Sequence, residues 1–154
     1  MKTEPYVIPY DAMWREVGCL YRALELGRAD LERSVEGVSA AALGAQPSAG
    51  APSIAALLLS CGEKEAAWIH QRWKKTDVPR PPSAAAGKDA IVGWLREIRE
   101  ATRLALMKAT DADLDRRTIP SDDGLASLRW ALHRLLDHAS FARGQIAMLR
   151  TLGK

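Results

Sequence analysis

The sequence predicts an all-α protein, an antiparallel four-helix bundle in one domain that spans residues 1–154. Apolar residues recur at three- and four-residue spacing in four long segments, which is the spacing of one helix face. Stretches rich in Pro, Gly, Ser and Asp separate these segments. At about 1.5 Å per residue, helices of roughly 22–28 residues would be about 33–42 Å long, which suits a bundle.

The first helix is expected from about Asp11, its predicted N-cap, to Val35. Its apolar stripe contains Trp14, Val17, Tyr21, Leu24, Leu31 and Val35. After a polar connection over residues 36–52, Ser53 is expected to cap a second helix that runs to about Trp73. The inner face of that helix contains Ile54, Leu57, Leu58, Cys61 and Trp68. Glu65 interrupts this face, either as a side chain that reaches the bundle end or as an inward carboxylate.

The proline-rich segment 78–87 is predicted to be a non-helical crossover loop or lid edge. A third helix is expected over about Lys88–Thr110, with an inner face of Ile91, Trp94, Leu95, Ile98, Thr102, Ala105 and Leu106. After a loop over residues 111–124, the fourth helix carries Leu128, Leu132, Leu135, Ala139, Ala142, Ile146 and Leu149. Periodicity alone does not determine the order in which these helices run up and down.

The charge pattern argues against nucleic acid as a partner. The chain carries 22 Lys and Arg and 19 Asp and Glu, a net charge of +3, and the two signs alternate along its whole length. No apolar stretch approaches the roughly 20 residues of a membrane span, and no signal peptide is recognisable, so we expect a cytoplasmic protein without a membrane partner. Cys19 and Cys61 are expected to be buried free thiols within helices.

Two stretches of the sequence carry a specific pattern. One reads Ser-Ile-Ala-Ala-Leu-Leu-Leu-Ser-Cys-Gly-Glu-Lys-Glu-Ala-Ala-Trp over residues 53–68. The other runs over residues 128–145 and ends in Arg-Gly-Gln, followed by the tail Leu-Arg-Thr-Leu-Gly. Both resemble the DinB/YfiT-like metalloenzyme superfamily, whose members are four-helix bundles with a divalent metal held by three histidines. The resemblance extends over nearly the whole chain and implies the same fold.

The resemblance places the three metal-ligand positions at Ser60, His138 and Ala142. Only His138 retains a metal-binding side chain, because a neutral hydroxyl is a poor ligand and a methyl group is none. The expected cofactor is therefore none. A weak Zn²⁺ or Ni²⁺ site remains open if Glu63 or Glu65 reaches across to His138, and these five residues are the pocket candidates. The alternative for His138 is a partly buried histidine paired with a carboxylate or backbone carbonyl.

The remaining conspicuous residues are interpreted as structural. His70 and His133 are expected at the surface or the edge of the helix stripes. Trp14, Trp68, Trp94 and Trp130 are expected in the core, and Trp73 at the rim of a pocket. Gly144, in the middle of the fourth helix, is expected to permit close helix packing.

Three functions are compatible with the sequence. The first is a bundle that has lost the three-histidine metal site and binds a small molecule or a partner through His138. The second, implied by the resemblance, is a thiol-dependent transferase or isomerase whose metal is held by substitute ligands. The third is a structural or stress-associated homodimer, which excess apolar residues such as Met13, Leu20 and Leu26 would support. We expect a homodimer, and no motif identifies a substrate.

Overall fold

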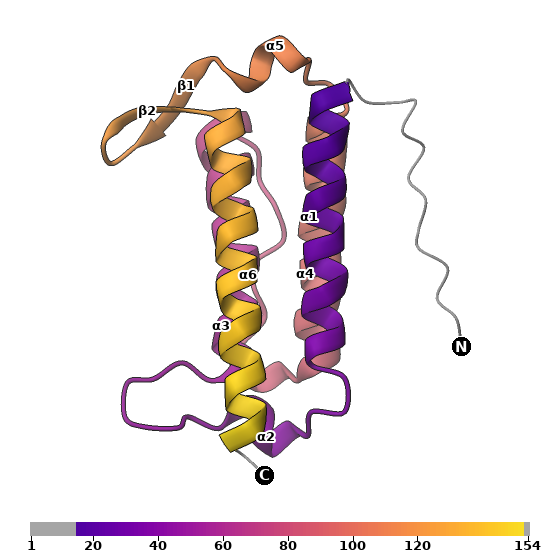
Figure 1. Ribbon diagram of the computed structural model, residues 1–154, viewed down its shortest axis with the longest axis vertical. Coiled ribbons are helices and arrows are strands. Elements are labelled where there is room, and N and C mark those ends of the chain that lie inside the picture. The colour runs from indigo at the N-terminus through magenta and orange to yellow at the C-terminus, as the bar shows by residue number, and fades with distance from the viewer. Residues whose placement is uncertain (1–14, 153–154) are drawn as a thin grey trace, which may run out of the picture.

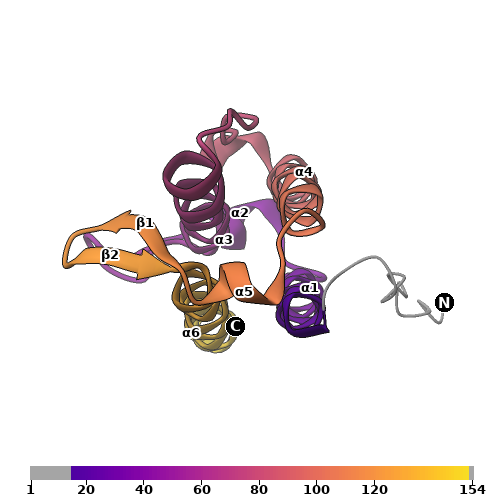
Figure 2. The same ribbon diagram turned by 90° about the horizontal axis from the view of Figure 1, so that it is seen from above.

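The computed structural model describes residues 15–152 and confirms the predicted all-α bundle. Its long helices stand at the corners of a square when viewed along the bundle axis (Figure 2). They are α1 (Arg15–Ser34), α3 (Ile54–Glu65) with its continuation η2 (Ala66–Lys74), α4 (Lys88–Leu106) and α6 (Leu128–Leu152) (Figure 1). No helix among residues 15–152 is long and apolar enough to cross a membrane. The predicted N-cap Asp11, and with it Met13 and Trp14, lies outside the described residues.

All three connections between the long helices contain short elements that the sequence did not indicate. A helix, α2 (Ala40–Gly44), interrupts the first connection, and the 3₁₀ turn η3 (Ala84–Ala86) ends the proline-rich segment that was predicted to be non-helical. The third connection contains α5 (Asp111–Leu114) and a hairpin of two antiparallel strands, β1 (Arg117–Ser121) and β2 (Gly124–Ser127). Helix α5 lies across one end of the bundle, and the hairpin extends sideways from that end beside α6 (Figure 1).

Helices α3 and α6 run antiparallel. The Ser60 hydroxyl oxygen lies 3.0 Å from Nε2 of His138, and the rings of Trp68 and Trp130 meet at 5.0 Å between centroids. Residue numbers therefore rise along one helix as they fall along the other. This pairing sets the side of the bundle where the candidate ligand positions lie.

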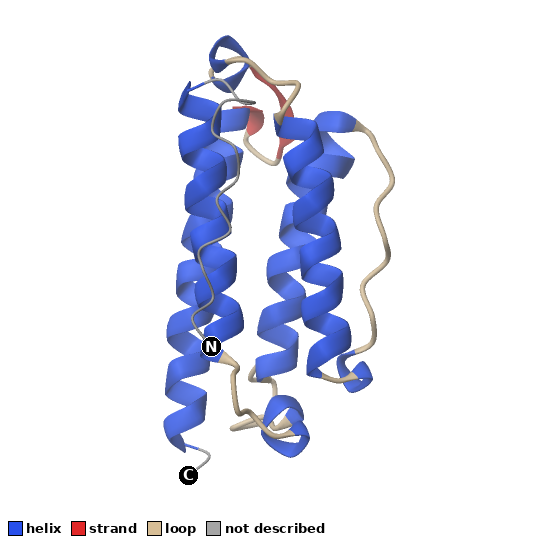
Figure 3. Ribbon diagram, turned by 90° about the vertical axis from the view of Figure 1, so that its right-hand side faces the viewer, coloured by secondary structure: helices blue, strands red, loops and turns tan. Residues whose placement is uncertain are grey.

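Helices α3 and α4, in contrast, run parallel. Glu65 pairs with Arg99 and His70 with Thr102, so residue numbers rise together along the two helices. The segment 75–87 makes this possible because it returns along the whole length of the bundle before α4 begins (Figure 3). The term antiparallel thus applies to α3 and α6 but not to α3 and α4, and the helices do not follow an up-down-up-down order.

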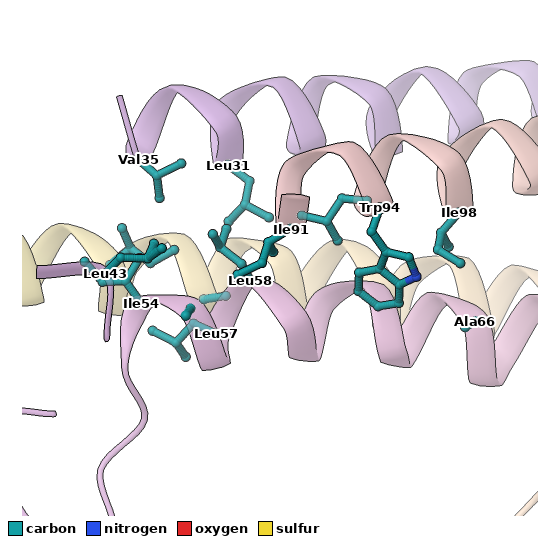
Figure 4. Close-up of a cluster of buried hydrophobic side chains, with 14 residues drawn as sticks. Leu31, Val35, Leu43, Ile54, Leu57, Leu58, Ala66, Ile91, Trp94 and Ile98 are labelled. Carbon is teal, nitrogen blue, oxygen red and sulfur yellow. The ribbon is translucent and has the colours of Figure 1, made fainter. Parts of the chain in front are cut away.

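The predicted apolar stripes form two buried clusters stacked along the bundle axis. One cluster contains Leu31, Ile54, Leu58, Ile91 and Trp94, which interlock between the four helices in Figure 4. The other cluster lies towards the hairpin and contains Val17, Leu24, Ile69, Leu106, Leu114, Ile119, Leu128 and Leu132. Side chains from the missed elements α5 and β1 complete this second cluster, so these segments belong to the core.

The start of α3 is as the sequence predicts. Ser53 is its N-cap, and the Ser53 hydroxyl oxygen accepts a hydrogen bond of 3.2 Å from the backbone N–H of Ala56. The helix then widens into η2, a π-helix that ends at Lys75 in a left-handed conformation with φ 57°. In a π-helix the hydrogen bonds run from i to i+5, so the residues that share a face differ from those in an α-helix.

Candidate functional site

Ser60 and His138 form a direct contact between α3 and α6. The Ser60 hydroxyl donates a hydrogen bond of 2.8 Å to the Leu57 carbonyl, one turn earlier. A hydroxyl has a single proton, so its oxygen accepts the 3.0 Å hydrogen bond from Nε2–H of His138. The structure therefore brings together two of the three positions that the resemblance indicated, and it fixes the orientation of the imidazole.

His138 is partly buried, and its surroundings favour the neutral imidazole. Burial is the largest cause that lowers the pKa of His138, and the positive charges of Lys64 and Arg134 lower it further. The prediction of a partly buried histidine is confirmed. Its partner is a hydroxyl, however, in place of the expected carboxylate or backbone carbonyl.

The third position, Ala142, lies fully buried one turn after His138 on α6. Its methyl group belongs to the apolar cluster that contains Leu58 and Trp94. The three positions together supply one imidazole, one hydroxyl and no third donor.

Glu63 and Glu65 are not drawn into this contact. Glu63 is exposed on α3. Glu65 is buried and faces α4, where its two carboxylate oxygens each accept a 2.8 Å hydrogen bond from the Arg99 guanidinium. Glu65 is therefore an inward carboxylate and not a side chain that reaches the end of the bundle. Among residues 15–152, no group of three or more His, Cys, Asp or Glu side chains could hold a metal ion.

A buried polar layer, defined here as Glu25, Glu65, His70, Arg99 and Thr102, lies between the two apolar clusters. Arg99 bonds Glu65 on α3 and also Glu25 on α1, at 3.2 Å. Burial opposes the ionised form of Glu65, but Arg99 and the Thr102 hydroxyl outweigh it and lower the pKa of Glu65. Arg99 and Thr102 were not recognised as polar partners from the sequence, although Arg99 follows Ile98 on the inner face of its helix.

His70 is the clearest error of the sequence analysis, since its side chain is only 2% exposed. Its Nε2 lies 3.1 Å from the Thr102 hydroxyl oxygen, and its Nδ1 lies 3.2 Å from the Thr76 hydroxyl oxygen. Both imidazole nitrogens of His70 are therefore within hydrogen-bond distance of a threonine hydroxyl. The widened spacing of η2 explains the error, because the prediction assumed α-helical periodicity.

The tryptophans divide into core and surface. Trp94 is buried as predicted, and its indole N–H donates a 2.8 Å hydrogen bond to the Pro79 carbonyl. Trp130 was expected in the core but is 44% exposed, because α6 turns this residue outward beside the hairpin. Trp68 is partly buried and packs edge-on against Trp130. Trp73 packs partly buried against the second cluster, with the Lys74 ammonium 4.6 Å from the centre of its ring.

Three smaller expectations need correction. Cys19 is a free thiol but is exposed on α1. Cys61 is also free and is partly buried, and burial raises the pKa of its thiol to about 12. Gly144 does not serve helix packing within the bundle, because a Cβ at this position would meet no other atom within 4 Å.

A continuous surface along α3 and α6, which we call the α3–α6 strip, connects these observations. It consists of Ser60, Lys64, Trp68, Trp130, Arg134 and His138. The Ser60–His138 contact marks one end and the Trp68–Trp130 contact the other. The strip thus places a neutral imidazole, two cations and two indole rings along one seam, which is chemistry suited to binding.

Comparison with known protein families identifies the family of this chain. The sequence pattern of the DinB superfamily matches residues 23–146, a range that includes all of α3, most of α6 and all three candidate ligand positions. No curated protein matches the chain.

Proposed function

The chain belongs to the DinB superfamily, and we propose that it is a member in which the metal position has become part of a binding site for a small molecule. The Ser60–His138 hydrogen bond carries this proposal. In a three-histidine site each ring offers a nitrogen lone pair to the metal. Here Nε2 of His138 is directed at a hydroxyl that already donates to the Leu57 carbonyl.

The donor set does not fit a divalent transition metal. One imidazole and one neutral hydroxyl leave at least one position without a protein ligand, and Ala142 has no donor atom. The local charge also opposes a cation, because Lys64 and Arg134 both act on His138. We therefore infer no step of chemistry through a metal, and we assign His138 the role of a polar contact for the bound molecule.

Metal content tests this proposal directly. Protein purified without an affinity tag would be analysed for metals and titrated calorimetrically with Zn²⁺ and Ni²⁺. The variants are His138→Ala and, as a positive control, the double substitution Ser60→His with Ala142→His. The native chain is expected to bind neither ion stoichiometrically. The double variant, if circular dichroism shows it folded, is expected to gain a site because it restores three imidazoles.

Stoichiometric metal in the native chain that disappears in His138→Ala would contradict the proposal. It would favour the alternative, a metal- and thiol-dependent transferase or isomerase that recruits other ligands around His138. Metal that persists in His138→Ala would place a site elsewhere and leave the interpretation of the strip unchanged.

A homodimer is a second candidate that one observation favours. The outer face of α6 carries Phe141, Met148 and Leu152, which are 65%, 63% and 69% exposed. Gly144 lies between Phe141 and Met148, and the space next to it is open.

Sedimentation velocity tests the dimer. The native chain is expected to sediment as a dimer, and Phe141→Glu as a monomer, because the new carboxylate would be buried between like copies. Leu26→Glu provides the control, since Leu26 is also exposed but lies on α1. A monomeric native chain would overturn this candidate.

A further inference from the structure

The α3–α6 strip brings two like charges face to face. Ser60 contacts His138, and Trp68 contacts Trp130 two turns away on both helices. Lys64 and Arg134 lie midway between these contacts on their respective helices, so they occupy the same level of the seam. Both side chains are exposed and act electrostatically on His138. A pair of cations at one level is unfavourable unless an anion or solvent separates them.

No carboxylate of the described residues neutralises this pair. Nine other arginines of the bundle lie within ion-pair distance of Asp or Glu, whereas Lys64 and Arg134 do not. The acidic residues nearest in sequence are Glu63, Glu65 and Asp137. Glu63 and Asp137 are exposed, and Glu65 is buried and paired with Arg99. The positive charge of the strip is therefore available to a ligand.

The hairpin end of the strip offers an apolar surface. Trp130 is 44% exposed, its ring lies 5.7 Å from the Arg134 guanidinium carbon, and Arg72 lies 4.4 Å from the ring centre of Trp68. A hollow of about 270 Å³ lies beside Trp130. Its apolar wall is formed by Trp130, Leu125 and Ala126, and polar side chains of the hairpin, among them Arg117 and Asp123, line the rest. A flat apolar group fits such surroundings, because indole rings offer a large rigid surface.

We propose that the α3–α6 strip binds a small molecule with an anionic group and a flat apolar body, the anion between Lys64 and Arg134 and the body against Trp130. This inference rests on the proposed function and specifies the class of ligand. A carboxylate or phosphate oxygen would accept hydrogen bonds from both cations, and charge-assisted hydrogen bonds are the stronger kind. Both anions share this chemistry, so both are tested.

The probes are 2-naphthoate, 2-naphthyl phosphate and the uncharged 2-naphthamide, titrated calorimetrically into the full chain. The variants are Lys64→Gln and Arg134→Gln, with Lys108→Gln as the matched control because Lys108 is an exposed cation at the far end of α4. We expect at least one anionic probe to bind. Each strip variant should weaken it by about threefold to tenfold, the control should leave it unchanged, and added salt should weaken it. Thermal unfolding would show that the variants remain folded.

The outcomes separate this inference from the proposed function. The relative affinities of naphthoate and naphthyl phosphate identify the preferred anion. The inference would be overturned if anion binding survives both strip substitutions, or if no probe binds. In either case the metal titration would still decide whether the proposed function is right about the metal. If naphthamide binds as tightly as the anions and a Trp130→Ala variant abolishes this, the anionic class is wrong while a small-molecule site on the strip remains.

Discussion

Arg99 is the residue on which the buried polar layer depends. Among residues 15–152 it is the one cation that pairs with both Glu65 on α3 and Glu25 on α1. A buried ion pair is not by itself stabilising, because both charges lose their hydration. Loss of one member has a large effect, however, since the partner is then left without compensation in the interior. Substitution of Arg99 and substitution of Glu65 should therefore lower the free energy of unfolding by different amounts.

Arg99→Met is predicted to destabilise the fold by about 3–5 kcal/mol at pH 7, and Glu65→Gln by about 1–2 kcal/mol. The first change leaves the buried Glu65 carboxylate without a cation, although Glu25 keeps its ion pair with Arg28. The second change leaves Arg99 paired with Glu25. Urea unfolding measures both. Equal losses would show that Glu25 does not share the charge of Arg99.

The acid dependence of the same variants is a separate prediction. In the native chain Arg99 lowers the pKa of Glu65, so its contribution is present above the unfolded pKa, about 4.3, and is lost as the pH falls through the folded value. Without Arg99, burial dominates and favours protonation of Glu65. The difference in free energy of unfolding between the native chain and Arg99→Met should therefore be largest at pH 7 and smaller near pH 4. A difference that does not change with pH would indicate that the variant loses packing contacts and that the charge of Arg99 has no effect.

Protonation of His70 is predicted to lower the free energy of unfolding as the pH falls below about 6.5. Burial lowers its pKa in the folded state and Glu65 opposes this only in part, so the unfolded chain binds the proton more readily. The neutral His70 thus contributes stability above its pKa in the unfolded chain. This contribution is lost as the pH falls towards its lower pKa in the folded chain. His138, whose pKa is also lowered, adds to the effect in the same direction.

Denaturant unfolding between pH 7 and pH 5 measures this dependence. His70→Gln should be less stable at pH 7, because it disturbs the hydrogen bonds to Thr76 and Thr102, but its stability should change less with pH. His133→Gln, a change of an exposed histidine on α6, is the control and should follow the native curve. If His70→Gln retains the full native pH dependence, another group is responsible.

At the scale of elements, the close approach of α3 and α4 depends on one glycine. A Cβ at Gly62 would lie 2.3 Å from a ring carbon of Trp94 and 2.8 Å from a methyl carbon of Leu95. The Trp94 ring cannot easily move aside, because its N–H is bonded to the Pro79 carbonyl. This crossing holds α3 against α4 while the opposite side of α3 forms the strip.

Gly62→Ala is predicted to destabilise the fold by about 1–3 kcal/mol, in spite of the better helix propensity of alanine. Gly93→Ala is the matched control, since Gly93 lies within α4 and a Cβ there would meet nothing within 4 Å. This change should be neutral or stabilise by up to about 1 kcal/mol. Thermal unfolding compares the two. A stabilised Gly62→Ala would show that the helices separate readily.

The elements that the sequence predicted are those with uninterrupted α-helical periodicity. The apolar stripes of α1, α4 and α6 are buried largely as expected, and the Ser53 cap lies in the predicted place. The π-helix η2 was not predictable from spacing, because its register differs from the α-helical one, and His70 was misplaced as a result. The hairpin was missed because Ile119 is its one buried strand residue, which gives no alternating pattern.

The candidate site was predictable only in outline. Ser60, His138 and Ala142 came from the resemblance, and the contact of Ser60 with His138 agrees with that alignment of the two helices. The opposed cations Lys64 and Arg134 were not recognised, since facing positions on two helices depend on their direction and register. The partner of Glu65 was missed for the same reason, because the parallel run of α3 and α4 decides that it is Arg99.

For the whole molecule, the parallel arrangement of α3 and α4 requires a long return segment. Residues 75–87 must lead from the end of η2 back to the start of α4, a distance of about 28 Å if it equals the length of Lys88–Leu106. Fully extended, these residues reach roughly 45 Å. The segment is also tied to the core, because Val78 packs against the first cluster and the Pro79 carbonyl accepts from Trp94.

Shortening this segment is predicted to abolish the native order of helices once its reach falls below the distance it must span. Deletion of residues 78–85 leaves five residues with a reach of about 17 Å, so α4 could pack beside α3 only in the antiparallel direction, which would separate Arg99 from Glu65. Deletion of the three residues Pro81–Ser83 leaves about 36 Å and should cost little stability, since loop-closure entropy changes slowly with length. Cooperative urea unfolding and amide exchange at Arg99 distinguish the two. If the variant lacking residues 78–85 unfolds as cooperatively and at the same urea concentration as the native chain, the bundle tolerates either direction of α4. Packing of the two apolar clusters, and not the length of the connection, would then determine the stability of the bundle.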